Sequence, residues 1–429
     1  MRLGYQISIV ISKCCAKATR LFNLGSGTSL PGKLALRLNP DILRYLISQT
    51  RNEIISVTGT NGKTTTSGFI SRILKANGSK IAHNRKGANM LEGITTAIIE
   101  SSNCFAKLDV DYSLLEADEA YLAKAVDHFN PALLLVTNLF RDQLDRYGEL
   151  DTTAKKIQQA IDKTVLKKPL KLILNADDPM VSRLGNKQTE IIYFGFDDIK
   201  FVNQEEKIKT PQEIANCKCG NKIDYSNVFY GHLGHYHCNC GKKRPETQIS
   251  ARAEIFPAGS KLIINSAKTG EFEVNIAMPG VYNAYNALAA VSVGIELNIP
   301  VEHIKKGMEE YNTVFGRAEL IELRGKQTLI QLIKNPIGAT EVLRTVKDDE
   351  NSRILIIIND NYADGRDVSW LWDANFELLK NHDKKIITSG IRAEDMAVRL
   401  KYAGIPQENI EIISDIEDAI RQAVEYTQE

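Results

Sequence analysis

Short apolar runs followed by polar residues recur along the first half of the chain. They lie at 54–57, 112–115, 133–136 and 170–174. Runs of this length are typical of parallel strands that are buried on both faces. The first run precedes a segment with helical spacing, in which Phe69, Ile70, Ile73 and Leu74 share one face. The pattern therefore predicts an α/β domain built on a parallel sheet.

Length and charge narrow the class of protein. The chain has 429 residues, 43% of them hydrophobic, which predicts two or three globular domains. Its 54 basic and 53 acidic residues give a net charge of +1, so no electrostatic footprint for nucleic acid is present. We find no transmembrane run and no signal-peptide cleavage site, which predicts a cytoplasmic protein.

The first 22 residues mix apolar and basic side chains at helical spacing. The apolar ones are Ile7, Ile9, Val10, Ile11, Leu21 and Phe22, and the basic ones are Lys13, Lys17 and Arg20. This pattern predicts an amphipathic helix that packs either on its own domain or on the inner surface of a membrane. Any membrane contact is expected to be peripheral at most.

The segment Thr58–Thr66 reads TGTNGKTTT and lies between the first apolar run and the first helical one. Strand, glycine loop and helix in this order form a phosphate cradle, because backbone N–H groups and a helix N-terminus surround the phosphates. Lys63 is expected to neutralise phosphate charge, and the Thr64 hydroxyl is expected to bind Mg²⁺. The predicted ATP-binding residues here are Gly59, Thr60, Asn61, Gly62, Lys63, Thr64 and Thr65.

The loop is similar to that of the Mur ligase and folylpolyglutamate synthetase superfamily. Later motifs in the expected order support the resemblance: EADE at 116–119, TNLFRDQLD at 137–145, NADDP at 175–179, GVYNAYN at 280–286 and GRAE at 316–319. The resemblance implies that Glu116 binds the catalytic magnesium, that Asn283 contacts adenine and that Arg317 contacts an ATP phosphate. Two departures are Gln143, in place of a histidine, and the degraded motif at 331–336.

The same resemblance implies the domain organisation. A Mur ligase-like central P-loop ATPase domain with a parallel sheet is expected over 1–312, with an inserted zinc ribbon at about 205–250. A Rossmann-like α/β C-terminal domain is expected over 313–429, although the chain ends before the last expected strand. The segment before Thr58 is too short for the nucleotide-sugar domain, of roughly 100 residues, that stem-building ligases carry.

Four of the seven cysteines lie within 24 residues, as two C-x-C-G pairs at Cys217, Cys219, Cys238 and Cys240. In a cytosolic chain this clustering favours metal over disulfides, and four thiolates suit tetrahedral Zn²⁺. Because most zinc knuckles are C-x-x-C, His237 is an alternative ligand. Redox-active thiols and unligated cysteines remain alternatives.

Three features together resemble the MurT type of ligase subunit. The nucleotide-sugar domain is missing, a four-cysteine ribbon is present, and the segment 359–370 reads NDNYADGRDVSW. The resemblance implies ATP-dependent amidation of the D-glutamate α-carboxylate in the lipid II stem through an acyl phosphate. It also implies a heterodimer with a GatD-type glutaminase, which supplies the ammonia. An aspartate after the apolar run 354–358 is expected to serve that glutaminase, and Asp360 is favoured over Asp364 and Asp367.

Two other functions remain open at this stage. A folylpolyglutamate synthetase-type ligase would share the phosphate loop and the missing nucleotide-sugar domain, but it would lack the ribbon. A P-loop nucleotide switch would bind Mg²⁺ and nucleotide without ligating anything, and the motifs at 280–286 and 316–319 argue against it. The predicted catalytic residues are thus Lys63, Glu116 and Asp360.

Overall fold

The computed structural model describes most of the chain in ten stretches: 2–21, 28–85, 88–141, 150–202, 216–256, 258–311, 317–347, 353–361, 366–381 and 385–425. The chain divides into two compact units. Unit 1 comprises Met1–Leu139 and Asp151–Asn312, and unit 2 comprises Phe140–Leu150 and Thr313–Glu429. The candidate phosphate site and the cysteine cluster both belong to unit 1.

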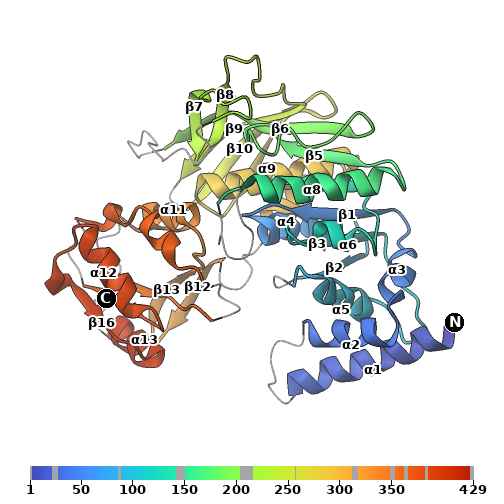
Figure 1. Cartoon of the computed structure of the whole chain (residues 1–429), viewed down its shortest axis with the longest axis horizontal. Helices are drawn as coiled ribbons and strands as arrows, with labels where there is room; N and C mark the ends of the chain where they lie inside the picture. The colour runs from blue at the N-terminus through green and yellow to red at the C-terminus, as the bar shows by residue number, and fades with distance from the viewer. Residues whose placement is uncertain are drawn as a thin grey trace. The chain divides into compact units, whose positions relative to one another are not determined.

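A nine-stranded sheet with the order β11-β10-β9-β6-β5-β4-β1-β3-β2 forms the centre of unit 1 (Figure 1). From β2 to β9 neighbouring strands are parallel, whereas β9, β10 and β11 are antiparallel. The predicted α/β class is therefore confirmed. The strands are β1 (Glu53–Thr58), β2 (Ile81–His83), β3 (Tyr112–Glu116), β4 (Leu133–Val136), β5 (Lys171–Asn175), β6 (Glu190–Phe201), β9 (Ile249–Phe256), β10 (Gly259–Ser266) and β11 (Gly270–Ile276).

Burial follows from the sequence pattern of each strand. The central strands β1, β3 and β4 are mostly apolar and almost wholly buried, because helices cover both faces of a parallel sheet. The strands β9 and β10 alternate buried and partly exposed residues, as expected of strands with one face in the core. The sequence analysis did not identify this antiparallel extension.

Helices cover the sheet of unit 1 on both faces (Figure 1). The helix after the phosphate loop, α4, packs against α9 and α10, and a separate core joins α1, α2, α3 and α5 to β2 and β3. Within the described residues, no helix has both the length and the apolar character needed to cross a membrane. The helices are α1 (Arg2–Leu21), α2 (Leu30–Leu38), α3 (Ile42–Ile47), α4 (Lys63–Ala76), α5 (Leu91–Ser101), α6 (Leu122–Ala125), α8 (Leu150–Val165), α9 (Val281–Glu296) and α10 (Val301–Glu309).

Residues 224–237, which lie between β6 and β9 in the sequence, form a small separate sheet. Its two antiparallel strands are β7 (Asp224–Tyr230) and β8 (Leu233–His237). Both cysteine pairs flank this hairpin, one before β7 and one after β8. We call residues 216–244 the ribbon.

Unit 2 is a smaller α/β body with its own core. Its parallel sheet has the order β14-β15-β16, and β12 and β13 form a separate hairpin. Helices pack on the sheet around Phe376, Ile386, Met396 and Leu400. The elements are β12 (Arg317–Leu323), β13 (Lys326–Gln331), α11 (Pro336–Val346), β14 (Ile354–Ile357), η1 (Ser369–Trp372), η2 (Phe376–Leu379), β15 (Ile386–Ser389), α12 (Ala393–Tyr402), η3 (Gln407–Asn409), β16 (Ile410–Ile412) and α13 (Ile416–Glu425).

Candidate active site and cysteine cluster

The phosphate loop connects β1 to α4 and requires glycine at two of its positions. Gly59 has φ +130°, and a Cβ there would lie 2.3 Å from the Thr137 hydroxyl oxygen. Gly62 has φ +82°, and a Cβ there would lie 1.9 Å from the Asn286 side-chain oxygen. Both positions exclude a side chain through backbone strain and lack of space. The loop therefore brings its backbone close to the strand and helix that surround it.

Thr137 and Asn138, which follow β4, hold the phosphate loop in place. The Asn138 side-chain oxygen accepts a hydrogen bond from the Asn61 N–H at 2.9 Å, and its carbonyl accepts one from the Thr60 N–H at 2.9 Å. The Thr137 hydroxyl donates to the Asn61 carbonyl at 2.9 Å. The sequence analysis noted this pair only as a family landmark. In the structure its role is to fix the loop from the neighbouring strand.

Thr64 and Glu116 come together at the carboxyl ends of adjacent strands. The Thr64 hydroxyl donates to the Glu116 carboxylate at 3.0 Å, and both side chains are buried. Asn84, the residue after β2, braces Glu116, because its amide oxygen accepts from the Glu116 N–H and its amide nitrogen donates to the Glu116 carbonyl, both at 2.8 Å. A hydroxyl and a carboxylate are hard oxygen donors, so this pair fits Mg²⁺. Asn84 was not identified from the sequence.

Lys63 lies on the loop side of the same site. Its Nζ donates to the Glu119 carboxylate at 2.9 Å and to the carbonyls of Gly59 at 2.5 Å and Thr60 at 3.2 Å. Burial alone would lower the pKa of Lys63, but the carboxylates of Glu119 and Asp118 outweigh it, so the pKa lies above its ordinary value. The ammonium is therefore fully charged at neutral pH, as a phosphate ligand must be.

The remaining predicted nucleotide residues take different positions. Thr65 is buried in the first turn of α4. The amide nitrogen of Asn283 donates to the Pro279 carbonyl at 2.7 Å, so its adenine contact stays a prediction. The second asparagine of that motif, Asn286, instead accepts from the Thr66 hydroxyl at 3.3 Å, beside the phosphate loop. Arg317 begins β12, and its side chain lies outside the described part of the structure, as does Gln143.

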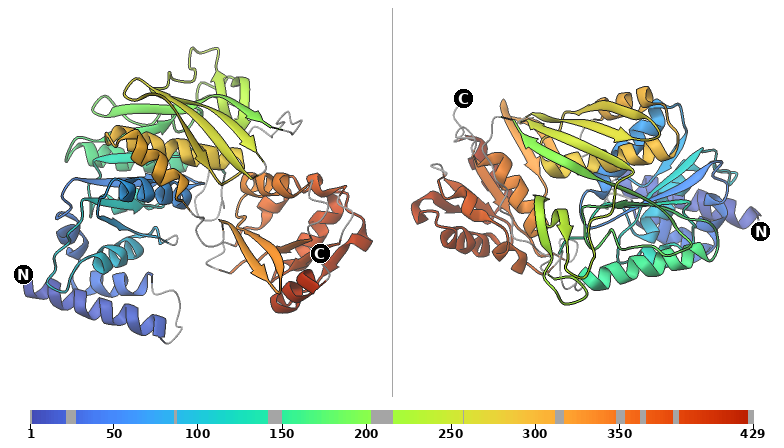
Figure 2. Two further views of the ribbon diagram at one scale, coloured as in Figure 1. Left: turned by 180° about the vertical axis from the view of Figure 1, so that it is seen from behind. Right: turned by 90° about the horizontal axis from the view of Figure 1, so that it is seen from above.

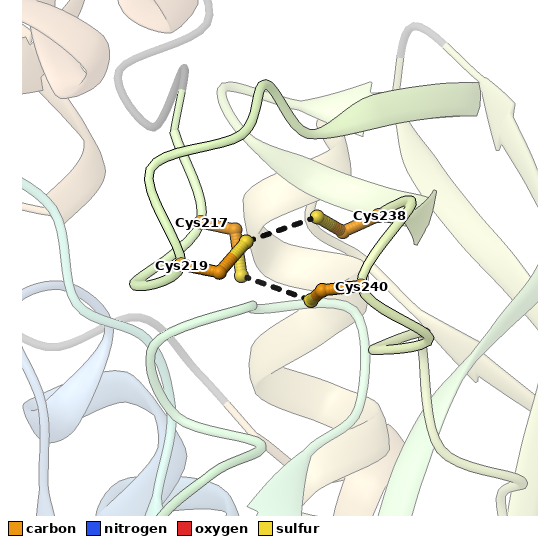
Figure 3. Close-up of side chains that lie close together, drawn as sticks. All are labelled: Cys217, Cys219, Cys238 and Cys240. Atoms are coloured by element: carbon orange, nitrogen blue, oxygen red, sulfur yellow. Dashed lines mark hydrogen bonds between the residues drawn. The ribbon is translucent and has the colours of Figure 1, made fainter.

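The four ribbon cysteines converge on one point (Figure 3). Their sulfur atoms all lie within 4.8 Å of one another, with Cys217 to Cys240 at 3.8 Å and Cys219 to Cys238 at 3.6 Å. Tetrahedral Zn²⁺ with bonds of about 2.3 Å requires sulfur atoms about 3.8 Å apart. The donor set and its spacing therefore fit Zn²⁺.

Each cysteine pair has the same turn. Gly220 donates its N–H to the Cys217 carbonyl at 2.8 Å, and Gly241 donates to the Cys238 carbonyl at 2.9 Å. The glycine φ angles are +88° and +89°, a region that favours glycine. The C-x-C-G spacing thus forms two equivalent knuckles. Among the described residues, no histidine joins the four-cysteine group, which leaves His237 outside it.

A buried polar network attaches the ribbon to the large sheet. Asp177 follows β5 and is fully buried; it accepts from Arg244 Nε at 2.5 Å, the Tyr285 hydroxyl at 2.8 Å and the Phe196 N–H at 2.8 Å. Burial raises the pKa of Asp177, and the Arg244 charge opposes that shift. The ribbon is therefore connected to β5, β6 and α9 through one carboxylate.

The next residue, Asp178, connects the ribbon to the segment that holds the phosphate loop. One carboxylate oxygen accepts from the Leu139 N–H at 2.8 Å and lies 3.4 Å from Nε2 of the buried His232. Leu139 directly follows the residues that hold the phosphate loop. The sequence analysis used the 175–179 motif only as support for the resemblance, and these contacts give it a structural role.

In unit 2, Asp360 lies in the loop that follows β14. Its carboxylate pairs with Arg392 Nη2 at 2.6 Å and is partly exposed. Asp367 instead accepts from the Ser369 N–H at 2.9 Å at the start of η1, which is the position of a turn residue. Asp364 lies outside the described residues. Of the two described aspartates, Asp360 has the strand-end position that the sequence analysis favoured.

Comparison with known proteins decides the family. The profile of the Mur ligase middle domain matches residues 57–232, and that of the MurT ligase C-terminal region matches 332–429. A lipid II isoglutaminyl synthase (glutamine-hydrolyzing) subunit MurT from Staphylococcus aureus (strain COL) is 39% identical over 98% of this chain and 92% of its own length. The chain belongs to the MurT family. The Streptococcus pneumoniae (strain ATCC BAA-255 / R6) MurT subunit is 37% identical over 94% and 88% of the two chains.

Membership of the MurT family confirms the predicted class of enzyme, a carbon–nitrogen ligase of the Mur type. Solved structures confirm the fold. A pseudomurein peptide ligase type C from Methanothermus fervidus matches with a TM-score of 0.69 and 24% identity over 90% of this chain and 76% of that one. The Mycobacterium tuberculosis folylpolyglutamate synthase matches with a TM-score of 0.60 and 13% identity over 93% and 91%. The fold alone thus does not distinguish a MurT-type ligase from a folylpolyglutamate synthase, whereas the sequence identity does.

Proposed function

We propose that this MurT-family chain amidates the D-glutamate α-carboxylate of the lipid II peptide stem to D-isoglutamine, using ATP and ammonia. The observation that carries the proposal is near full-length identity of 37–39% to proteins named as subunits of a lipid II isoglutaminyl synthase. The phosphate site supports it, since Lys63, Thr64 and Glu116 form the charged end that phosphoryl transfer requires.

The first chemical step activates the carboxylate. A carboxylate oxygen attacks the γ-phosphorus of ATP, the bond to the β–γ bridging oxygen breaks, and ADP leaves with that electron pair. Thr64 and Glu116 would hold Mg²⁺, which supplies charge neutralisation at the phosphates. Lys63 would have to release one of its three present acceptors in order to donate to a phosphate oxygen. Its several backbone and carboxylate partners keep the amine at the loop until then.

The second step forms the amide. Ammonia attacks the acyl phosphate carbon, phosphate departs with the C–O electron pair, and the nitrogen loses a proton to give the neutral amide. At neutral pH most free ammonia is the protonated ion, which is not a nucleophile. We therefore propose a heterodimer with a GatD-type glutaminase. The word "subunit" and the phrase "glutamine-hydrolyzing" in the names of the relatives support this partner.

We also propose that Cys217, Cys219, Cys238 and Cys240 bind one Zn²⁺. Four thiolates would complete a tetrahedral shell, so the ion would stabilise the ribbon and leave no position for substrate. The two equivalent knuckles and the sulfur spacing support the assignment. The anchoring of the ribbon through Asp177 supports a structural role.

Removal of the phosphate-site charges tests the proposed reaction. We expect Lys63→Ala and Glu116→Gln each to lower amidation of lipid II more than a hundredfold, with ammonia as nitrogen donor and amide formation measured by mass spectrometry. Glu273→Gln is the matched control, because it makes the same chemical change on the edge strand β11, where Glu273 pairs with Lys261. Losses below tenfold at both site positions would remove their catalytic assignment. ATP turnover without amide formation by the unchanged chain would refute lipid II as the substrate.

A further inference from the structure

Helix α1 exposes large apolar residues that an ordinary surface helix would bury. Its buried side includes small polar residues: Ser8, Ser12 and Thr19. Its outward side carries large apolar residues, with exposed fractions of 69% for Leu3, 51% for Ile7, 43% for Val10, 40% for Ile11 and 80% for Leu21. A helix adapted to water on this side would expose its polar residues instead. The outward side therefore has the composition of a contact surface.

The exposed apolar residues form one continuous stripe, which we call the α1 stripe. Leu3, Ile7, Val10, Cys14, Ala18 and Leu21 follow each other at steps of three or four residues, and all are exposed. A helix of 20 residues is about 30 Å long, so the stripe extends over about that distance. In Figure 1 and in the left view of Figure 2, α2 lies between α1 and α5, and α1 lies on the outer side.

The charged residues of α1 and of the segment that follows it, up to residue 40, all carry positive charge. The whole chain has 54 basic and 53 acidic residues, but its first 40 residues contain no Asp or Glu. They contain six basic residues: Arg2, Lys13, Lys17, Arg20, Lys33 and Arg37. Lys17, Lys33 and Arg37 are exposed. Lys13 contacts the Ser102 carbonyl, and Arg20 pairs with Glu100. An anionic surface would be complementary to this segment.

We propose that the α1 stripe docks on an anionic lipid bilayer, with α1 lying in the plane of the interface and the flanking lysine and arginine side chains facing the phosphate headgroups. An apolar stripe with basic flanks is the pattern of an interfacial helix, and α1 is too polar to span the membrane. Self-association through the same face would bring two wholly cationic segments together, which disfavours a second copy. The use of this contact to the protein rests on the proposed function, because lipid II is held in a bilayer.

Vesicle binding of the full chain tests the proposal. We expect the chain to sediment with vesicles of phosphatidylglycerol and phosphatidylcholine, and to bind at least tenfold more weakly to phosphatidylcholine alone or at 0.5 M salt. Ile7→Ser with Val10→Ser should weaken binding about a hundredfold, about tenfold for each side chain. Leu166→Ser with Val398→Ser is the matched control, because it removes two exposed aliphatic side chains elsewhere and should leave binding unchanged.

Three results would overturn the proposal. Equal vesicle binding by the Ile7/Val10 variant and the unchanged chain would exclude the α1 stripe as the membrane contact. Loss of a dimer in that variant, without vesicle binding by the unchanged chain, would assign the stripe to a second copy. Loss of glutaminase binding would assign it to that partner. Amidation of lipid II in detergent separates membrane docking from the proposed function. The Ile7/Val10 variant should amidate lipid II in detergent as the unchanged chain does. If the unchanged chain fails to amidate lipid II in detergent, the proposed function alone is refuted.

Discussion

Arg244 closes the buried network that attaches the ribbon to the large sheet, so its replacement measures that attachment. Arg244→Met keeps most of the side-chain length but removes the guanidinium. The variant loses the bond to Asp177 at 2.5 Å and the bond from Nη2 to the Phe196 carbonyl at 3.0 Å. Asp177 keeps its bonds from the Phe196 N–H and the Tyr285 hydroxyl, but its charge loses the only cation that contacts it among the described residues.

The expected cost is large because Asp177 is fully buried. A hydrogen bond that involves a charged group contributes about 1.5–3 kcal/mol, and the Arg244 guanidinium makes two of them. Their sum of roughly 3–6 kcal/mol covers the roughly 3–5 kcal/mol lost when one partner of a buried ion pair is removed, and the two bonds that Asp177 keeps favour the lower part of this range. We therefore expect the local free energy of opening at β6 to β8 to fall by about 3–4 kcal/mol.

Hydrogen exchange measured by mass spectrometry detects this change locally. At about 1.4 kcal/mol per tenfold, amides of β7, β8 and β6 should exchange roughly 100- to 1000-fold faster in Arg244→Met. Both tryptophans of the chain, Trp370 and Trp372, lie in unit 2, so their fluorescence serves as an internal control. Its urea transition should not move. Exchange in β14 and β15 should also remain unchanged.

Two further measurements identify the buried charge as the cause. Asp177→Asn with Arg244→Met should be more stable than Arg244→Met alone, because no charge is then left unpaired. Burial raises the pKa of Asp177, and loss of Arg244 raises it further. Since protonation of the native carboxyl relieves the cost, the penalty should be smaller at pH 5 than at pH 7.5. Exchange that rises less than tenfold, or equally at both pH values, would refute the reasoning.

Three other predictions concern the cysteine cluster, the phosphate-site edge and unit 2. Purified protein should contain one zinc per chain by elemental analysis, and Cys238→Ser should lower this at least tenfold, whereas zinc-free wild type would exclude the site. Burial, followed by the charges of Arg85 and Lys75, lowers the pKa of His83 from 6.5 to about 3. Between these two values only the unfolded chain binds the proton, so the free energy of unfolding should fall by about 1.4 kcal/mol for each pH unit below 6.5. In His83→Phe this contribution to the difference in the free energy of unfolding between pH 7.5 and pH 5.5, measured by urea denaturation, should disappear. An unchanged pH dependence would contradict the prediction. Asp360→Asn should keep ammonia-supported amidation but lower glutamine-supported amidation at least tenfold, if Asp360 orients the glutaminase histidine; equal loss with both donors would place it in the ligase site.

Local patterns in the sequence determined the central parallel strands and the phosphate loop. Apolar runs of four or five residues gave β1, β3, β4 and β5, because central strands of a parallel sheet are buried on both faces. The parallel order then placed Thr64 and Glu116 at one edge of the sheet, where their side chains lie 3.0 Å apart. The two C-x-C-G turns were equally local, since each is closed by hydrogen bonds within five residues.

Only the tertiary structure decided which distant groups support these elements. Asn84 braces Glu116 across 32 positions, and Asn286 reaches the phosphate loop from α9 across more than 200. Neither contact has a local signal, because an asparagine satisfies its amide with whatever backbone the fold brings near it. The pairing of Asp177 with Arg244, 67 residues apart, likewise depends on the ribbon folding back onto β6.

The orientation of α1 shows the same division. Sequence periodicity determined that 2–21 is helical, but apolar residues occur on more than one side of it, as Ile7 and Ile9 illustrate. Packing decided that Ile9 is buried and that Ile7 is exposed. A helix gains its stability from the face that its neighbours cover, and that choice depends on the shapes of α2 and α5. Periodicity therefore fixed the helix, whereas the surface that it leaves exposed was decided by the fold.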